Sequence, residues 1–282
     1  MYPNAFEYHR ATSVEEAVGI LAADPEAKIL AGGHSLIPAM KLRLAMPGTL
    51  VDLSRIDSLR GITVNGGATI GAMTTYRELL DSDELASAFP VIRTTARVVG
   101  DPAVRNRGTL GGALAHSDPA ADYTAVMLAL GASVNVTGSN GERTIAADDL
   151  FVDLFTTSME PDEVLTSISI PAADGAGMAY HKHAHPASGY AVVGVAVVLK
   201  MSGGTCSSAR IAVTGATSYA QRATAAEQAL TAKALDADTI AASAAHASDG
   251  LDLNGDVYAS ADYRGNLIRV LAKRAITEAA GL

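Results

Sequence analysis

The stretch KILAGGHSLIPAMKLRLAMP, residues 28–47, joins a short apolar run to a glycine pair and then to a basic segment. Lys28–Ala31 is typical of a strand that ends in a tight turn at Gly32 and Gly33. Glycine lets backbone N–H groups approach an anion because no Cβ stands in the way, and successive amides form an anion-binding concavity. Ser35 adds a hydroxyl donor beside those amides. The stretch alone is compatible with an ordinary turn as well as with a turn that binds phosphate groups.

A second glycine-rich turn, TLGGA at residues 109–113, follows the basic segment 105–107. Two such turns can hold a diphosphate from opposite sides, which predicts a nucleotide or dinucleotide site. The chain has no G-x-G-x-x-G that opens a helix and no G-x-x-x-x-G-K-[ST]. A Rossmann domain and a P-loop are therefore both excluded.

Composition narrows the class of protein further. The formal net charge of −9 over 282 residues argues against general binding to nucleic acid or to anionic membranes, since both need a basic surface. The single cysteine, Cys206, excludes an intrachain disulfide and any cysteine-ligated iron–sulfur cluster held by this chain alone. No basic leader precedes an apolar run at the N-terminus, and the apolar runs are too short to span a bilayer. We expect a cytoplasmic protein.

The pattern of elements changes twice along the chain. The first part has the pattern of a strand, a helix and a strand, with a capping box at Ser13 and Glu16. This pattern predicts a small parallel α/β unit. The middle part opens with a hairpin at Asn65-Gly66 and continues as an α+β unit. The last part has two strong strands, with Cys206 expected in a hairpin turn, and then alanine-rich helices. The final helix is expected near residues 261–280, with Leu267, Val270, Leu271 and Ile276 broadly on one face.

Three blocks of sequence resemble one known family. They are AGGHSLIPAMKLRLAMPGTLVDLSRI (31–56), RNRGTLGGALAHSDPAAD (105–122) and HPASGYAVVGVAVV (185–198). They resemble the FAD-binding medium subunit of the molybdenum hydroxylases, a family that includes the aerobic carbon monoxide dehydrogenase medium subunit and the flavin domain of xanthine dehydrogenase. The resemblance covers essentially the whole chain.

The resemblance implies an α+β protein with a vanillyl-alcohol-oxidase (PCMH)-type FAD-binding domain. That domain would consist of two α/β subdomains, residues 1–56 and 57–173. A C-terminal α+β domain, an antiparallel sheet with helices, would follow at 174–282. FAD would lie between the first two subdomains, with its diphosphate on the two glycine turns.

The resemblance also implies the residues that contact FAD. Asp118 and Asp122 would lie near the ribose and other polar groups of the cofactor, Leu165 near the adenine, and Lys182 and Tyr190 near the isoalloxazine. The full set is Ala31, Gly32, Gly33, His34, Ser35, Leu36, Thr109, Gly111, Gly112, Ala113, Asp118, Asp122, Leu165, Lys182 and Tyr190. No catalytic residue and no metal ligand is implied in this chain.

Two positions depart from the family pattern. His34 stands where the family commonly has glutamine, and Ala113 where it commonly has asparagine. The missing asparagine amide removes one hydrogen bond to the cofactor, worth about 0.5–1.5 kcal/mol. Some oxidases with this fold bind flavin covalently through a histidine in such a turn, so His34 has two interpretations. We favour a noncovalent turn residue, because the rest of the chain matches the medium subunit better.

Two further groups of residues also have two interpretations each. His181, His183 and His185 alternate, so on a strand they would share one face and could imitate a metal site. We favour a polar face, because no fourth ligand is evident. Asp118 could cap a helix that begins at Pro119 as well as lie near the cofactor, and the two roles are compatible.

The resemblance predicts an oxidoreductase subunit that transfers electrons. A large molybdenum-cofactor subunit would oxidise the substrate, and a small subunit with two [2Fe–2S] clusters would pass electrons to this flavin and on to an external acceptor. The complex would be a heterohexamer, a dimer of heterotrimers, with no membrane association except through partners. Two alternatives stay open, a self-contained flavin oxidoreductase and a flavin-free structural subunit. Carbon monoxide, purines, aldehydes and N-heterocycles all stay open as substrates.

Overall fold

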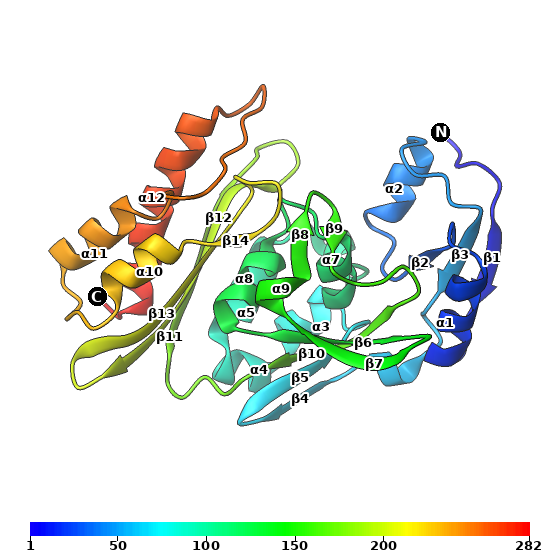
Figure 1. Cartoon of the computed structure of the whole chain (residues 1–282), viewed down its shortest axis with the longest axis horizontal. Coiled ribbons are helices and arrows are strands. Elements are labelled where there is room, and N and C mark those ends of the chain that lie inside the picture. Colours follow the sequence, from blue (N-terminus) through cyan, green and yellow to red (C-terminus); the bar gives the residue numbers. More distant parts are fainter.

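The computed structural model describes all 282 residues, which form three units in chain order (Figure 1). The elements of the first unit are β1 Glu7–Arg10, α1 Val14–Ala23, β2 Lys28–Leu30, α2 Leu36–Lys41 and β3 Thr49–Asp52. Its three strands are parallel, in the order β1-β3-β2. Ser13 caps α1 by accepting a hydrogen bond from the N–H of Glu16. The small parallel α/β unit expected from the sequence is confirmed.

The second unit is built on a five-stranded antiparallel sheet. Its strands are β4 Ile62–Asn65, β5 Gly67–Gly71, β6 Ser133–Gly138, β7 Gly141–Ala146 and β10 Val164–Ile170, in the order β4-β5-β10-β6-β7. A two-stranded ribbon adds β8 Phe151–Asp153 and β9 Thr156–Thr157. The hairpin expected at Asn65-Gly66 joins β4 to β5, and Gly66 has the φ of +71° that favours glycine there.

Helices of the second unit cover its sheet and fill the space toward the third unit. They are the 3-10 turn η1 Asp57–Leu59, α3 Tyr76–Asp81, α4 Asp83–Ala88, α5 Pro90–Val98, α6 Pro102–Arg105, α7 Leu110–His116, α8 Asp122–Leu130 and α9 Ala147–Leu150. Every residue of α8 is buried. The reason is that α8, together with α5, lies between the sheet of the second unit and that of the third (Figure 1).

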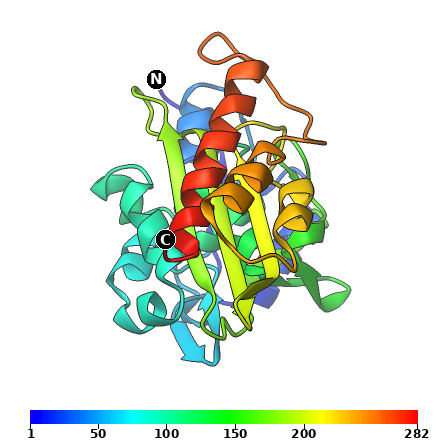
Figure 2. The ribbon, with the colours of Figure 1, turned by 90° about the vertical axis from the view of Figure 1, so that its left-hand side faces the viewer.

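The third unit is an antiparallel sheet with helices on its outer face (Figure 2). Its elements are β11 Gly177–Ala184, β12 Ala191–Ser202, β13 Thr205–Thr214, β14 Gln221–Arg222, α10 Thr224–Leu230, α11 Ala237–Ala245 and α12 Ala261–Ala279. The central strand β12 is an almost continuous apolar run, because helices cover both faces of the sheet. The expected α+β architecture of this unit is confirmed.

The first two units share a hydrophobic core. Leu59, Met73 and Val164 belong to the second unit, yet they pack with residues of α1 and β3. A separate core of 21 buried residues lies between the third sheet and its helices. The domain boundaries at residues 56 and 173 stay predictions. None of the helices combines the length and the apolar character needed to cross a lipid bilayer.

Three local expectations were wrong. The helix expected at Pro119 begins at Asp122, because residues 118–121 form a turn in which the Asp118 carboxylate accepts the N–H of Ala120. Cys206 is a buried strand residue of β13 and not a hairpin-turn residue. Val270 of α12 is exposed, because the buried face of that helix runs through Ile268, Leu271 and Ala272 instead.

Candidate cofactor site

The first glycine turn connects β2 to α2 and carries unpaired backbone donors. The N–H groups of residues 32–36 donate no hydrogen bond within the chain. Gly33 has a φ of +75°, which favours glycine at this place in the turn. Five successive amides without a protein acceptor need an external acceptor or water, and backbone donors in such a row suit an anion. The turn therefore fits the diphosphate of FAD.

His34 lies on the outside of this turn. Its side chain is exposed, and Nδ1 is 3.3 Å from the carbonyl oxygen of Gly32. Ala31 and Leu36, at the two ends of the turn, are both partly buried. The geometry is that of a turn residue that contacts its own backbone.

The second glycine turn is organised differently. Thr109 caps α7 by accepting the N–H of Gly112 at 3.2 Å. The N–H groups of Leu110 and Gly111 donate to the carbonyls of Thr74 and Ala72. Most amides of this turn are thus already paired within the chain. The sequence predicted two equivalent turns, whereas the structure leaves a row of unpaired donors only on the first.

The two turns meet although they lie far apart in the sequence. A Cβ on Gly32 would lie 2.2 Å from the carbonyl oxygen of Arg107, and a Cβ on Gly112 would lie 3.5 Å from the Cβ of Ala31. A Cβ on Gly111 would lie 2.5 Å from the Cβ of Ala72. Glycine at positions 32 and 111 is therefore required by close approach of the backbone. Together the two turns form one cradle, and Ala113 lies in the first turn of α7.

Tyr190 brings the third unit to this cradle. Its side chain is about half exposed, and its pKa responds to the Ser35 hydroxyl of the first unit. Burial raises the pKa of Tyr190, the charge of Asp118 raises it further, and the Ser35 hydroxyl opposes both. Because these groups influence each other, Ser35, Asp118 and Tyr190 are neighbours. Each of the three units therefore contributes one polar side chain to the same place.

Three other residues expected at the cofactor lie in the interior. Leu165 is 4% exposed and belongs to the core of the second unit. The Asp122 carboxylate is 7% exposed and the Lys182 side chain 4% exposed. Their contacts are internal, and their role at the cofactor stays a prediction.

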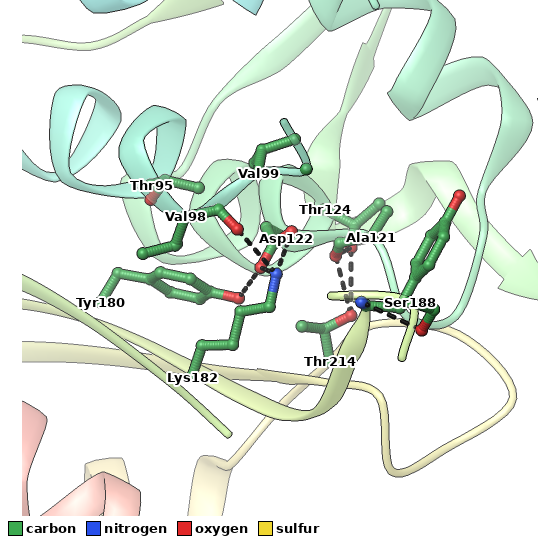
Figure 3. Close-up of polar contacts among 12 residues, drawn as sticks. Thr95, Val98, Val99, Ala121, Asp122, Thr124, Tyr180, Lys182, Ser188 and Thr214 are labelled. Carbon is green, nitrogen blue, oxygen red and sulfur yellow. Dashed lines mark hydrogen bonds and ion pairs between the residues drawn. The ribbon is translucent and has the colours of Figure 1, made fainter. Parts of the chain in front are cut away.

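Asp122 and Lys182 form a buried ion pair (Figure 3). The Lys182 ammonium lies 2.9 and 3.0 Å from the two carboxylate oxygens, and it also donates to the Val98 carbonyl at 3.1 Å. The Tyr180 hydroxyl donates to the same carboxylate at 2.6 Å. Burial raises the pKa of Asp122, while the Lys182 charge and the Tyr180 hydrogen bond oppose that rise.

Tyr180 and Thr214 hold this region together, although the sequence pattern did not single them out. Tyr180 alternates with Lys182 along β11, so the period of two already placed both side chains on the face opposite the histidines. Thr214 carries no such signal. Its Oγ1 lies 2.6 Å from the carbonyl of Pro119 and 2.9 Å from that of Ala121.

His181 and His183 share one face of β11, whereas His185 lies just past the end of the strand, so the expected shared face holds for only two of the three histidines; each has its own partner. His181 Nε2 lies 2.7 Å from Glu278, the His183 ring packs edge-on against Tyr263, and the His185 ring packs against Tyr258. No group of three or more histidine, cysteine or acidic side chains is arranged to hold a metal ion.

Comparison with known proteins identifies the class to which this fold and cradle belong. Residues 4–173 match the FAD binding domain in molybdopterin dehydrogenase, and residues 178–279 match the CO dehydrogenase flavoprotein C-terminal domain. The chain belongs to the family of FAD-binding medium subunits of molybdenum hydroxylases. It is therefore an oxidoreductase subunit, and its cofactor is FAD.

Individual relatives match along nearly their whole length. The carbon monoxide dehydrogenase medium chain of Hydrogenophaga pseudoflava is 40% identical over 99% of this chain and 98% of that one. The nicotine 6-hydroxylase medium subunit of Paenarthrobacter nicotinovorans is 37% identical over 98% of this chain and 97% of that one. The solved carbon monoxide dehydrogenase of Hydrogenophaga pseudoflava superposes with a TM-score of 0.96, at 42% identity over 100% of this chain and 99% of that chain.

Proposed function

We propose that this chain carries electrons from the [2Fe–2S] clusters of a small partner subunit, through its FAD, to an external acceptor. A large partner subunit with the molybdenum cofactor would oxidise the substrate. The observation that carries the proposal is the row of unpaired amides at residues 32–36 in a chain that matches medium subunits from end to end. Cys206, the only cysteine, is buried in β13, so the clusters must belong to another chain.

Bound FAD supplies the redox chemistry, because it can take up and release electrons. The residues of this chain bind and orient it. The amides of residues 32–36 and the Ser35 hydroxyl would hold the diphosphate against the second turn. The half-exposed ring of Tyr190 offers a flat surface on which an aromatic ring system can stack. Asp118 would accept hydrogen bonds from hydroxyl groups beside it.

The partners and their number are part of the same proposal. Relatives with quite different substrates, carbon monoxide and nicotine among them, carry a medium chain of this length. That supports a shared electron-transfer role, with the substrate chosen by the large subunit. We propose two copies of each of three subunits. The lone buried cysteine supports assembly in the cytoplasm, where thiols stay reduced.

Purification of the chain from its own host tests the proposal. We expect a tagged chain to bring down one larger and one smaller subunit, together with molybdenum, iron and FAD. A chain that purifies alone, without either metal, and oxidises a substrate itself would be a self-contained flavin enzyme. A complex with partners but no flavin absorbance would instead make this chain a structural subunit. A screen of carbon monoxide, purines, aldehydes and N-heterocycles on the complex would then find the substrate.

A further inference from the structure

A fully paired polar network is buried between the second and third units (Figure 3). Asp122 is the first residue of α8, whereas Tyr180 and Lys182 come from β11. The carboxylate accepts hydrogen bonds from both side chains, and the third contact of the ammonium is the Val98 carbonyl at the end of α5. The network thus fixes three elements, α5, α8 and β11, relative to one another.

Such a network contributes position more than stability. Removing two charges from water costs several kcal/mol per ion, so a buried ion pair is often no more stabilising than apolar residues of the same volume. Apart from a few threonines, such as Thr124 and Thr214, the surrounding layer is apolar, since all of α8 is buried and most of its residues belong to the hydrophobic core. The ion pair, unlike apolar packing, specifies where α8 begins relative to β11, because its hydrogen bonds have fixed lengths and directions.

Both sides of the network lead directly to the cofactor cradle. On one side, residues 118–121 immediately precede Asp122 and carry Asp118. Thr214 and Gly215 hold this segment from the third unit, because both interact with the carbonyl of Pro119, at 2.6 and 2.7 Å. The position of Asp118 is therefore set by the contact between the second and third units.

On the other side, β11 continues past Lys182 into the loop that carries Tyr190. The N–H of His185 donates to the carbonyl of Tyr190 at 2.8 Å, which closes that loop. The Asp118 charge and the Ser35 hydroxyl both act on the pKa of Tyr190, so the three side chains lie near one another. A change in the distance between Asp122 and Lys182 would thus alter the spacing between Asp118 and Tyr190.

We propose that Asp122 and Lys182 are positioning residues that shape the FAD site without contacting the cofactor. Their ion pair sets the distance between the Asp118 segment and the Tyr190 loop, and Thr214 supports the same arrangement. The inference rests on the proposed placement of FAD in the cradle of the two glycine turns.

The test compares Asp122→Asn, Lys182→Met and the double variant in the complex as isolated from its host. FAD is removed and titrated back, and its Kd, the visible circular dichroism of the bound flavin and the Tm are measured. Each single variant should raise the Kd for FAD about tenfold and change the flavin dichroism in the same way. The double variant should raise the Kd for FAD no more than the weaker-binding single variant does, because the two groups act as one unit. Lys182→Arg should restore part of the affinity.

Glu227→Gln is the matched control. Glu227 also has a 7% exposed carboxylate in an ion pair, with Arg222, but it lies in α10 on the outer side of the third unit. The Glu227→Gln variant should have a lower Tm but a Kd for FAD within about twofold of the wild type. If Lys182→Met and Asp122→Asn behave like this control, the network is only structural and the inference is wrong.

Two other outcomes are informative. If Lys182→Met weakens FAD binding and Asp122→Asn does not, Lys182 contacts the flavin itself, which also overturns the inference. If the wild-type complex holds no FAD, the proposed function fails instead, so the two failures are distinguishable. Should Lys182→Met not fold, the comparison of Asp122→Asn with Lys182→Arg and the Glu227→Gln control still decides the matter.

Discussion

Replacement of Gly32 by alanine should separate the two glycine turns and weaken FAD binding. The added methyl group would lie 2.2 Å from the carbonyl oxygen of Arg107, 2.9 Å from its carbonyl carbon and 3.0 Å from the Cα of Gly108. All three atoms belong to the backbone, so no side chain can rotate away. Because ordinary contact begins at 3.4 Å, one turn must move by about 1.2 Å, which is 3.4 minus 2.2.

The size of the effect follows from that displacement. Overpacking of this kind costs about 1–3 kcal/mol of folding stability. The larger loss falls on the cofactor, because a shift of the turn moves the unpaired amides of residues 32–36 away from the diphosphate. A hydrogen bond to a charged group contributes about 1.5–3 kcal/mol, and each 1.4 kcal/mol is a factor of ten. Loss of one such bond should raise the Kd for FAD by at least about tenfold.

The assay is the flavin content of the purified complex, followed by titration of FAD into the flavin-free form. Gly48→Ala is the control, because Gly48 lies in the same unit and a Cβ there would meet nothing within 4 Å. We expect stoichiometric FAD in Gly48→Ala and substoichiometric FAD in Gly32→Ala. Wild-type affinity in Gly32→Ala would refute the assignment of this turn to the diphosphate.

Three further predictions concern side chains around the site and the sheet. Tyr190→Phe should have nearly the wild-type Kd for FAD, because only the ring stacks on the cofactor. Tyr190→Ala should raise that Kd about two- to tenfold, and equilibrium titration checks both variants. Thr109→Ala removes the cap of α7 and should lower the free energy of unfolding, measured in urea, by about 1 kcal/mol. Thr109→Ser should lower it less, because serine can also cap the helix. The Arg143 guanidinium holds the pKa of Glu163 below its ordinary value of 4.5, so the pair stabilises the fold above that pH. As the pH falls below 4.5, the free energy of unfolding should decrease more steeply for the wild type than for Glu163→Gln. Parallel curves of unfolding free energy against pH would contradict this.

Local features of the fold could be predicted because their causes are local. The hairpin at Asn65-Gly66 needs only a residue with positive φ between two strands, and Gly66 supplies it. The cap at Ser13 needs only its own side chain and an N–H three residues away. Val270 was misplaced because a helical pattern defines an apolar face but not which edge of that face meets the sheet.

The assembly of the site could be predicted only in part, because its contacts join distant segments. The glycine pairs and Ser35 were visible in the sequence as donors, but the contact of Gly32 with Arg107 was not. The pairing of the second-turn amides with residues 72–74 could not be predicted either, since no residue near TLGGA in the sequence indicates it. Asp122 and Lys182 could be placed near the cofactor only by resemblance. Their burial against each other is a property of the packed units.

The unequal pairing of the two turns implies a division of roles within the cradle. The first turn keeps its amides unpaired and lies in the smallest unit, whose sheet has only three short strands. A row of unpaired donors cannot hold its own shape, so rigidity must come from elsewhere. The second turn supplies it, because the amides of Leu110 and Gly111 donate to the carbonyls of Thr74 and Ala72, and Gly111 packs directly against Ala72. The third unit adds the Thr214 contact and the Tyr190 loop on the remaining side. FAD affinity should therefore depend on how the three units pack as much as on the residues that touch the cofactor.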